Sequence, residues 1–237
     1  GFVAAAERLV ARTPAQHRAN GIDVRTRHEV VAIDTHAARV TVRALDTGVQ
    51  TSEPYDALLI ATGASGIRPP WPGIDAVGVL QLRTLDDAAA VQARLAAGAR
   101  RAVVVGAGYI GLEVAEGLLE RGLQVTVLER QSAPMGAVLD ADMVDDVAAA
   151  IRAAGVDLRL GAEVTGFVTR DGQVAAVRTA AGPVDADLVV IGLGVRPNVE
   201  LARAAGIGID ASGGIRVDDR MRTDTPNVWA AGDCVAL

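Results

Sequence analysis

The stretch 101–129 carries a glycine-rich turn between two apolar strands, and no other part of the chain constrains the fold as strongly. We expect a strand over Arg101–Val105, a helix that continues to Arg121 and stops at Gly122, and a second strand that ends in Glu129. The turn has the pattern G-x-G-x-x-G, and the acid stands 18 residues after its last glycine. These parts come in the order that a dinucleotide-binding unit needs. The turn reads Gly106-Ala107-Gly108-Tyr109-Ile110-Gly111.

Each part of this unit has a physical role in holding a dinucleotide. Gly106 permits the tight turn, Gly108 lets the backbone approach a pyrophosphate, and Gly111 lets the helix lie close to the sheet. The free N–H groups at the helix N-terminus would face the phosphates. Glu129 would accept hydrogen bonds from the adenosine ribose diol, which favours NAD(H), whereas Arg130 could pair with a 2′-phosphate. The alternative is that the glycines serve only a tight turn between strand and helix.

The composition excludes several classes of protein. Half of the 237 residues are hydrophobic and 3% are aromatic, which suits an α/β protein but not a protein that stacks nucleic-acid bases. The net charge is −6 and no basic stripe exists, so we expect no nucleic-acid partner. No apolar run reaches the roughly 18 residues of a membrane span, so we expect no membrane partner. A single cysteine, Cys234, forbids an intrachain disulfide and a cysteine-based metal site, and we expect no metal. We expect Cys234 to be a small buried thiol.

Other patterns divide the chain into segments. We expect a helix capped by Thr13 near the start, strands at 29–34, 39–45 and 55–61, and a short strand at 23–25. The proline-rich stretch 68–73 cannot be a helix or a central strand, and we expect it to connect two domains. Helices are expected at 85–97 and 141–154, then strands at 157–160, 163–169, 174–179 and 188–191, with a hairpin turn at Asp171-Gly172. A glycine-rich loop (192–198), a short helix (199–205), an edge strand (213–218) and a strand ending in Gly232-Asp233 follow.

These landmarks, in this order, resemble the flavin-dependent pyridine nucleotide-disulfide oxidoreductases. The motifs that carry the resemblance lie at 55–63, 106–113, 192–198 and 223–233, and they cover essentially the whole chain. Segments at 12–14, 21–24, 28–30 and 33–34 are similar to the branch of coenzyme A-disulfide reductases, NADH oxidases and persulfide reductases. The resemblance implies a Rossmann-like three-layer α/β fold, in which an NAD domain (84–190) is inserted into a truncated FAD domain (1–83 and 191–237). It also implies a cytoplasmic enzyme that is a homodimer as a whole.

The same resemblance implies a role for particular residues. Asp233 would hydrogen-bond the ribitol of FAD, unless it only caps a turn. Glu113 would face the nicotinamide, unless it is a solvated carboxylate that the helix dipole favours. Gly192 and Gly194 would line the nicotinamide side, unless they only form a tight turn at a strand end. The remaining residues expected to lie close to the flavin are Ala61, Thr62, Gly63 and Gly232.

Parts of the family's pattern are not in this sequence. The first G-x-G-x-x-G, the redox cysteine and the dimerisation domain would lie before residue 1 or after residue 237, so we expect an interior portion of a longer enzyme that binds FAD poorly by itself. We expect no catalytic residue in this chain. The whole enzyme would transfer a hydride from NADH to FAD and then reduce a small-molecule disulfide or another oxidant. One alternative is a cysteine-free ferredoxin or rubredoxin reductase, to which the stretch 82–87 is similar. The other alternative is a nucleotide-binding module that has no activity of its own.

Overall fold

A computed structural model describes residues 10–136 and 138–236, and the chain divides into two compact units. The continuous unit comprises Gly66–Val195. The discontinuous unit comprises the segments before and after it, which meet it at Ser65 and Arg196. The expected domain boundaries at 83/84 and 190/191 lie inside the continuous unit. The difference at the first boundary arises because residues 79 and 80 pair with the sheet of the continuous unit.

The continuous unit is built on a parallel sheet. Within the described residues this sheet has five strands in the order β6-β13-β7-β8-β9, and every neighbouring pair is parallel. The register places the last residues of β13, β7 and β8 side by side, because Ile191 pairs with Val105 and Val105 pairs with Leu128. The residues that follow these strands therefore meet at one edge of the sheet. The strands are β6 (Val79–Leu80), β7 (Arg101–Val105), β8 (Gln124–Leu128), β9 (Asp157–Arg159) and β13 (Leu188–Ile191).

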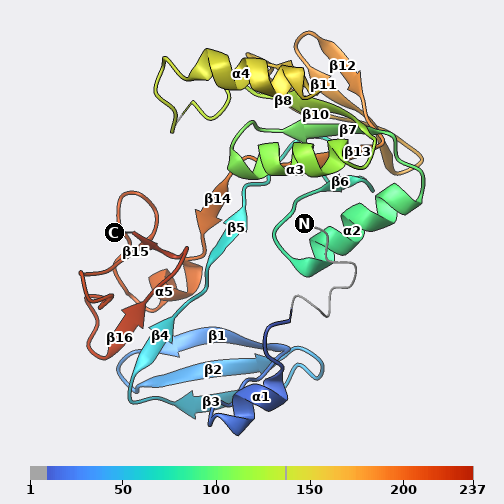
Figure 1. The fold of residues 1–237 in the computed structure, drawn as a ribbon. Helices are drawn as coiled ribbons and strands as arrows, with labels where there is room; N and C mark the ends of the chain where they lie inside the picture. Colours follow the sequence, from blue (N-terminus) through green and yellow to red (C-terminus); the bar gives the residue numbers. More distant parts are fainter. Residues whose placement is uncertain (1–9, 137, 237) are drawn as a thin grey trace. The chain divides into compact units, whose positions relative to one another are not determined.

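The two faces of this sheet are covered differently (Figure 1). Alternate residues of β7 point to opposite faces, as the period of a strand requires. Ala102 and Val104 pack with the helices α2 (Leu85–Ala96), α3 (Tyr109–Leu119) and α4 (Val144–Ala153). Val103 and Val105 pack with an antiparallel meander of β10 (Val164–Arg170), β11 (Gln173–Thr179) and β12 (Gly182–Asp185). Helices, sheet and meander form three layers, so the prediction of a Rossmann-like three-layer α/β fold is confirmed.

The discontinuous unit contains smaller sheets around a separate core. β1 (His28–Asp34), β2 (Arg39–Ala44) and β3 (Gln50–Pro54) form an antiparallel sheet, and the helix α1 (Pro14–Ala19) precedes them. β4 (Leu58–Ile60) pairs in parallel with β16 (Val228–Ala230), and β15 (Ile215–Arg216) pairs in parallel with β17 (Val235–Ala236). The helix α5 (Glu200–Ala204) contributes to the core. A short pair, β5 (Ala64–Gly66) with β14 (Val195–Pro197), lies where the chain passes between the units.

Several expected elements differ from the structure. No strand forms at 23–25, and the strand expected over 55–61 is limited to β4. β3 and β12 were not expected, because neither has an apolar alternation, and each is held by pairing with a preceding strand. The helix expected from 141 begins at Val144. The expected Thr13 cap and the Asp171-Gly172 hairpin are confirmed, the hairpin with both turn residues at positive φ. None of the helices in the described ranges is both long and apolar enough to cross a lipid bilayer.

Candidate functional site

The glycine turn between β7 and α3 is shaped by close backbone contacts. Gly106 has φ +105°, and a Cβ on it would overlap the carbonyl oxygen of Gly192. A Cβ on Gly111 would likewise overlap the carbonyl oxygen of Gly106. Gly108 is different, because it has an extended backbone (φ −82°) and, apart from its neighbours in the chain, no atom lies within 4 Å of the position of a Cβ. The fold therefore requires glycine at Gly106 and Gly111, but it does not require glycine at Gly108.

The turn lies at the point where the order of the sheet reverses. From β7 the chain proceeds through α3 to β8 on one side, and it later returns to β13 on the other side. Open parallel sheets bind ligands in the crevice outside the strand ends at such a point. Here Gly106 follows β7 and Gly192 follows β13, and the two residues are in contact.

A cavity of about 790 Å³ opens at this edge of the continuous unit, a size that suits a cofactor. Most of the predicted cofactor-binding residues of this unit line the cavity. They are Gly106, Ala107, Gly108, Tyr109, Ile110, Glu129, Arg130, Gly192 and Gly194. Gly111 does not line it, because it packs beneath the turn. Glu113 does not line it either, and its side chain is exposed on α3.

Glu129 faces the turn from the end of β8. Its Oε2 accepts a hydrogen bond from the Ala107 N–H at 2.8 Å, and its Oε1 accepts one from the Gln131 N–H at 2.8 Å. The two hydrogen bonds fix the position of the carboxylate. Arg130 is exposed beside it, and no residue in the described part of the chain forms a hydrogen bond or ion pair with its guanidinium. The cavity thus has a fixed acid and an available cation at one end.

Some residues of the cavity were not identified from the sequence. Trp71 lines it and contacts Phe167 of β10, with ring centroids 6.1 Å apart in an edge-to-face arrangement. Met135 and Glu163 line it from the loops after β8 and β9. No local pattern marks these positions, since each reaches the cavity through contacts between distant segments. The proline-rich stretch, which we expected only to connect domains, forms a wall of the site.

The predicted flavin residues belong to the discontinuous unit. Thr62 and Gly63 are tied to Asn198: the Asn198 N–H donates to the Gly63 carbonyl, and Asn198 Nδ2 donates to the Thr62 carbonyl, both at 2.9 Å. Apart from their neighbours in the chain, Gly63 (φ +66°) and Gly232 (φ +83°) have no atom within 4 Å of a Cβ position. Ala61, Thr62 and Asp233 are exposed. These open backbone positions leave room for a ligand to approach the chain closely.

Cys234 lies in the core of the discontinuous unit. It is fully buried, and its thiol contacts the Ala231 carbonyl oxygen at 3.2 Å. The expectation of a small buried thiol is confirmed. Within residues 10–136 and 138–236, no cluster of three or more His, Cys, Asp or Glu side chains is placed to hold a metal ion.

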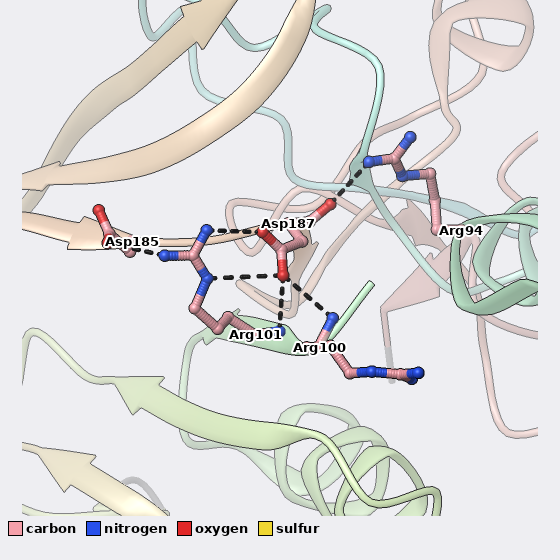
Figure 2. A network of polar contacts seen from close by, with 5 residues as sticks. All are labelled: Arg94, Arg100, Arg101, Asp185 and Asp187. Atoms are coloured by element: carbon pink, nitrogen blue, oxygen red, sulfur yellow. Dashed lines mark hydrogen bonds and ion pairs between the residues drawn. The ribbon is translucent and has the colours of Figure 1, made fainter. Parts of the chain in front are cut away.

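The opposite edge of the parallel sheet carries a polar network (Figure 2). Asp187 precedes β13 and Arg101 begins β7, and their side chains form a hydrogen-bonded ion pair at 2.7 Å. The hydrogen bond from Arg101, supported by the backbone N–H groups of Arg100 and Arg101, lowers the pKa of Asp187 to about 2, against the opposing effect of partial burial. Arg101 also pairs with Asp185, and Arg94 donates to the Asp187 carbonyl oxygen. Because this network holds the amino ends of the strands, we assign it to the stability of the sheet.

Comparison with known proteins agrees with this geometry. A family model described as pyridine nucleotide-disulphide oxidoreductase matches residues 2–236. An NADH oxidase of Enterococcus faecalis is 36% identical over 238 residues, which cover 100% of this chain and 53% of the oxidase. A rubredoxin-NAD(+) reductase of Pseudomonas putida is 36% identical over 216 residues, which cover 91% of this chain and 54% of the reductase.

Solved structures show the same likeness. An NAD-dependent persulfide reductase from A. fulgidus matches with a TM-score of 0.94 and 36% identity, covering 98% of this chain and 43% of that protein. The chain spans about half the length of the curated relatives that it matches. Since the family model covers nearly the whole chain, the protein belongs to the pyridine nucleotide-disulphide oxidoreductase family.

Proposed function

We propose that the cavity of the continuous unit binds NAD(H), and that the chain is part of an FAD-dependent NAD(P)H oxidoreductase. The observation that carries this proposal is Gly108. The fold leaves a Cβ at this position unobstructed, so a glycine here is explained by a ligand that must approach the backbone. Gly108 is also the N-cap of α3 and provides no side-chain cap, which leaves the first N–H groups of the helix available to phosphate oxygens.

The other residues of the cavity complete the site. Glu129 has lone pairs remaining on both carboxylate oxygens, and these would accept hydrogen bonds from the adenosine ribose. Gly192 and Gly194 would provide a flat backbone surface on the nicotinamide side. When bound, NADH would supply a hydride to the FAD of the whole enzyme, and the reduced flavin would supply two electrons to a disulfide, which becomes two thiols, or to another oxidant. The protein's own residues bind and orient the dinucleotide and exclude water.

We assign the flavin site of the whole enzyme to the discontinuous unit. Thr62, Gly63, Gly232 and Asp233 are the candidates, and the open space at both glycines supports a close approach of the cofactor. Cys234 is fully buried, so we do not assign it as the redox cysteine of a disulfide reductase. A cytoplasmic location and a homodimeric whole enzyme stay predictions of the resemblance.

A second function is supported by one of the relatives. The name of the rubredoxin-NAD(+) reductase specifies a protein as its substrate. This reductase and the NADH oxidase have the same sequence identity to this chain, 36%. In that case electrons would leave the flavin for a redox protein, without a cysteine. An anaerobic NADH titration of the whole enzyme distinguishes the two. A long-wavelength flavin–thiolate band, with more than one NADH consumed per flavin, would show the disulfide type, and simple bleaching at one equivalent would show the other.

The dinucleotide site itself can be tested with two glycine variants. Gly108→Ala places a methyl group in the cavity, and Gly117→Ala places one in open space on the same helix. We expect Gly108→Ala to keep the thermal stability of the protein but to weaken NAD⁺ binding by about tenfold, equivalent to about 1.4 kcal/mol. Gly117→Ala should leave the affinity unchanged. Isothermal titration calorimetry measures both, and equal NAD⁺ affinities for the two variants would contradict the proposed site.

A further inference from the structure

Ala107 is held from both sides by the segment that follows β8. Its N–H donates to Glu129 Oε2 at 2.8 Å, and its carbonyl oxygen accepts a hydrogen bond from the Met135 N–H at 2.9 Å. The N–H belongs to the peptide group that joins Ala107 to Gly106, and the carbonyl belongs to the one that joins it to Gly108. Both peptide planes in the middle of the glycine turn are therefore fixed, and Ala107 is fully buried.

Glu129 is itself anchored without a ligand. Its backbone N–H donates to the Arg159 carbonyl at 2.9 Å, and its backbone carbonyl accepts from the Ala162 N–H at 2.8 Å. Its second carboxylate oxygen accepts from the Gln131 N–H at 2.8 Å. The carboxylate is thus directed at the turn by the backbone of the neighbouring strand β9, of the loop after β9 and of Gln131.

Met135 adopts a conformation that needs support from its surroundings. Its φ of +52° is in the left-handed region, which costs a residue with a side chain roughly 1–2 kcal/mol. Its carbonyl oxygen accepts hydrogen bonds from the N–H groups of Val138 and Leu139 at 2.9 and 3.1 Å. These bonds hold Met135 in the conformation in which its N–H donates to the Ala107 carbonyl oxygen.

We propose that Glu129 is a positioning residue for the glycine turn, acting through Ala107 together with the Met135 loop, in addition to any contact with ribose. This inference rests on the proposed dinucleotide site. The carboxylate would keep the turn in the orientation in which the N–H groups after Gly108 meet the pyrophosphate. Removal of the acid would then weaken the binding of every dinucleotide, including one that has no hydroxyl group for Glu129 to bind.

A pair of ligands separates positioning from ribose binding. NAD⁺ and an NAD⁺ analogue that lacks both hydroxyls of the adenosine ribose are titrated into the protein and into Glu129→Gln. The amide has one acceptor oxygen, so one of the two hydrogen bonds to the backbone is lost. We expect a loss of affinity of roughly tenfold for the dideoxy analogue as well as for NAD⁺. The matched control is Glu116→Gln, an exposed acid on α3 that does not line the cavity.

A second measurement needs no ligand. Hydrogen exchange of the Ala107 amide should accelerate in Glu129→Gln and stay slow in Glu116→Gln. A loss of affinity confined to NAD⁺, with unchanged exchange at Ala107, would overturn the positioning role while leaving the dinucleotide site intact. If the unaltered protein bound neither ligand, the proposed function would be contradicted. The positioning role would then be contradicted too, because it depends on the dinucleotide site.

Discussion

Arg101 donates through Nη2 to Oδ1 of Asp187 at 2.7 Å, and this ion pair joins the first residue of β7 to the residue before β13. The pair lies at the sheet edge opposite the cavity. Asp187 has a pKa of about 2 in the folded protein, below its ordinary value of 3.8. A carboxyl group whose pKa is lowered by folding stabilises the protein above its unfolded pKa, and this contribution is lost as the pH falls towards the folded pKa.

The network therefore predicts a dependence of stability on pH between about 4 and 2. Asp187→Asn should lower the free energy of unfolding at pH 7 by about 2 kcal/mol, since each unit of pKa shift corresponds to about 1.4 kcal/mol. The difference from the unaltered protein should shrink as the pH falls below 4. Urea unfolding at several pH values measures it, with the exposed Asp185 as the control in Asp185→Asn. A difference that is the same at pH 7 and pH 2.5 would refute the assignment.

Gly111 should be the glycine of the turn that the fold needs most. A Cβ at this position would overlap the backbone oxygen of Gly106 and stand 3.1 Å from its carbonyl carbon, and neither group can move as a flexible side chain can. We expect Gly111→Ala to lower the free energy of unfolding by about 1–3 kcal/mol. Gly117→Ala on the same helix should be neutral or stabilise by up to about 1 kcal/mol, because alanine favours the helix. Equal stabilities of the two variants would show that α3 can move away from the turn at little cost.

The unit 101–129 could be predicted in detail because its signals are local. Apolar strands, a glycine pattern and a helix stop encode the backbone from residue to residue, and β7 forms over the expected residues. Gly106 and Gly111 have the roles that their spacing indicates, as tight turn and close packing.

The remaining parts of the site depend on contacts between distant segments. The wall formed by Trp71 exists because its ring packs on Phe167, 96 positions later in the sequence. β3 and β12 are polar strands that only pairing with a neighbour identifies. The left-handed Met135 could not be predicted, since methionine has no preference for that conformation and the loop contacts impose it.

The choice between NADH and NADPH should depend on Glu129 and Arg130 in opposite ways. The carboxylate of Glu129 is fixed towards the cavity and would repel a 2′-phosphate, so we expect tighter binding of NADH. Arg130 is exposed and without a partner among the described residues, so it would contribute to NADPH binding through a charge-assisted hydrogen bond. Arg130→Ala should weaken NADPH binding by roughly tenfold and change NADH binding little. Calorimetric titrations with both coenzymes test this, and tighter binding of NADPH by the unaltered protein would contradict the preference.

Trp71 should report directly on the occupancy of the cavity. The chain has two tryptophans, of which Trp71 lines the cavity and Trp229 lies in β16 of the other unit. We expect NAD⁺ to change the fluorescence of Trp71, because the bound dinucleotide would displace water from one side of its ring. NAD⁺ is the suitable probe, since it does not absorb tryptophan emission as NADH does. The change should persist in Trp229→Phe and disappear in Trp71→Phe, which keeps an aromatic ring next to Phe167. If the change persisted in Trp71→Phe and disappeared in Trp229→Phe, the dinucleotide would bind outside the cavity described above.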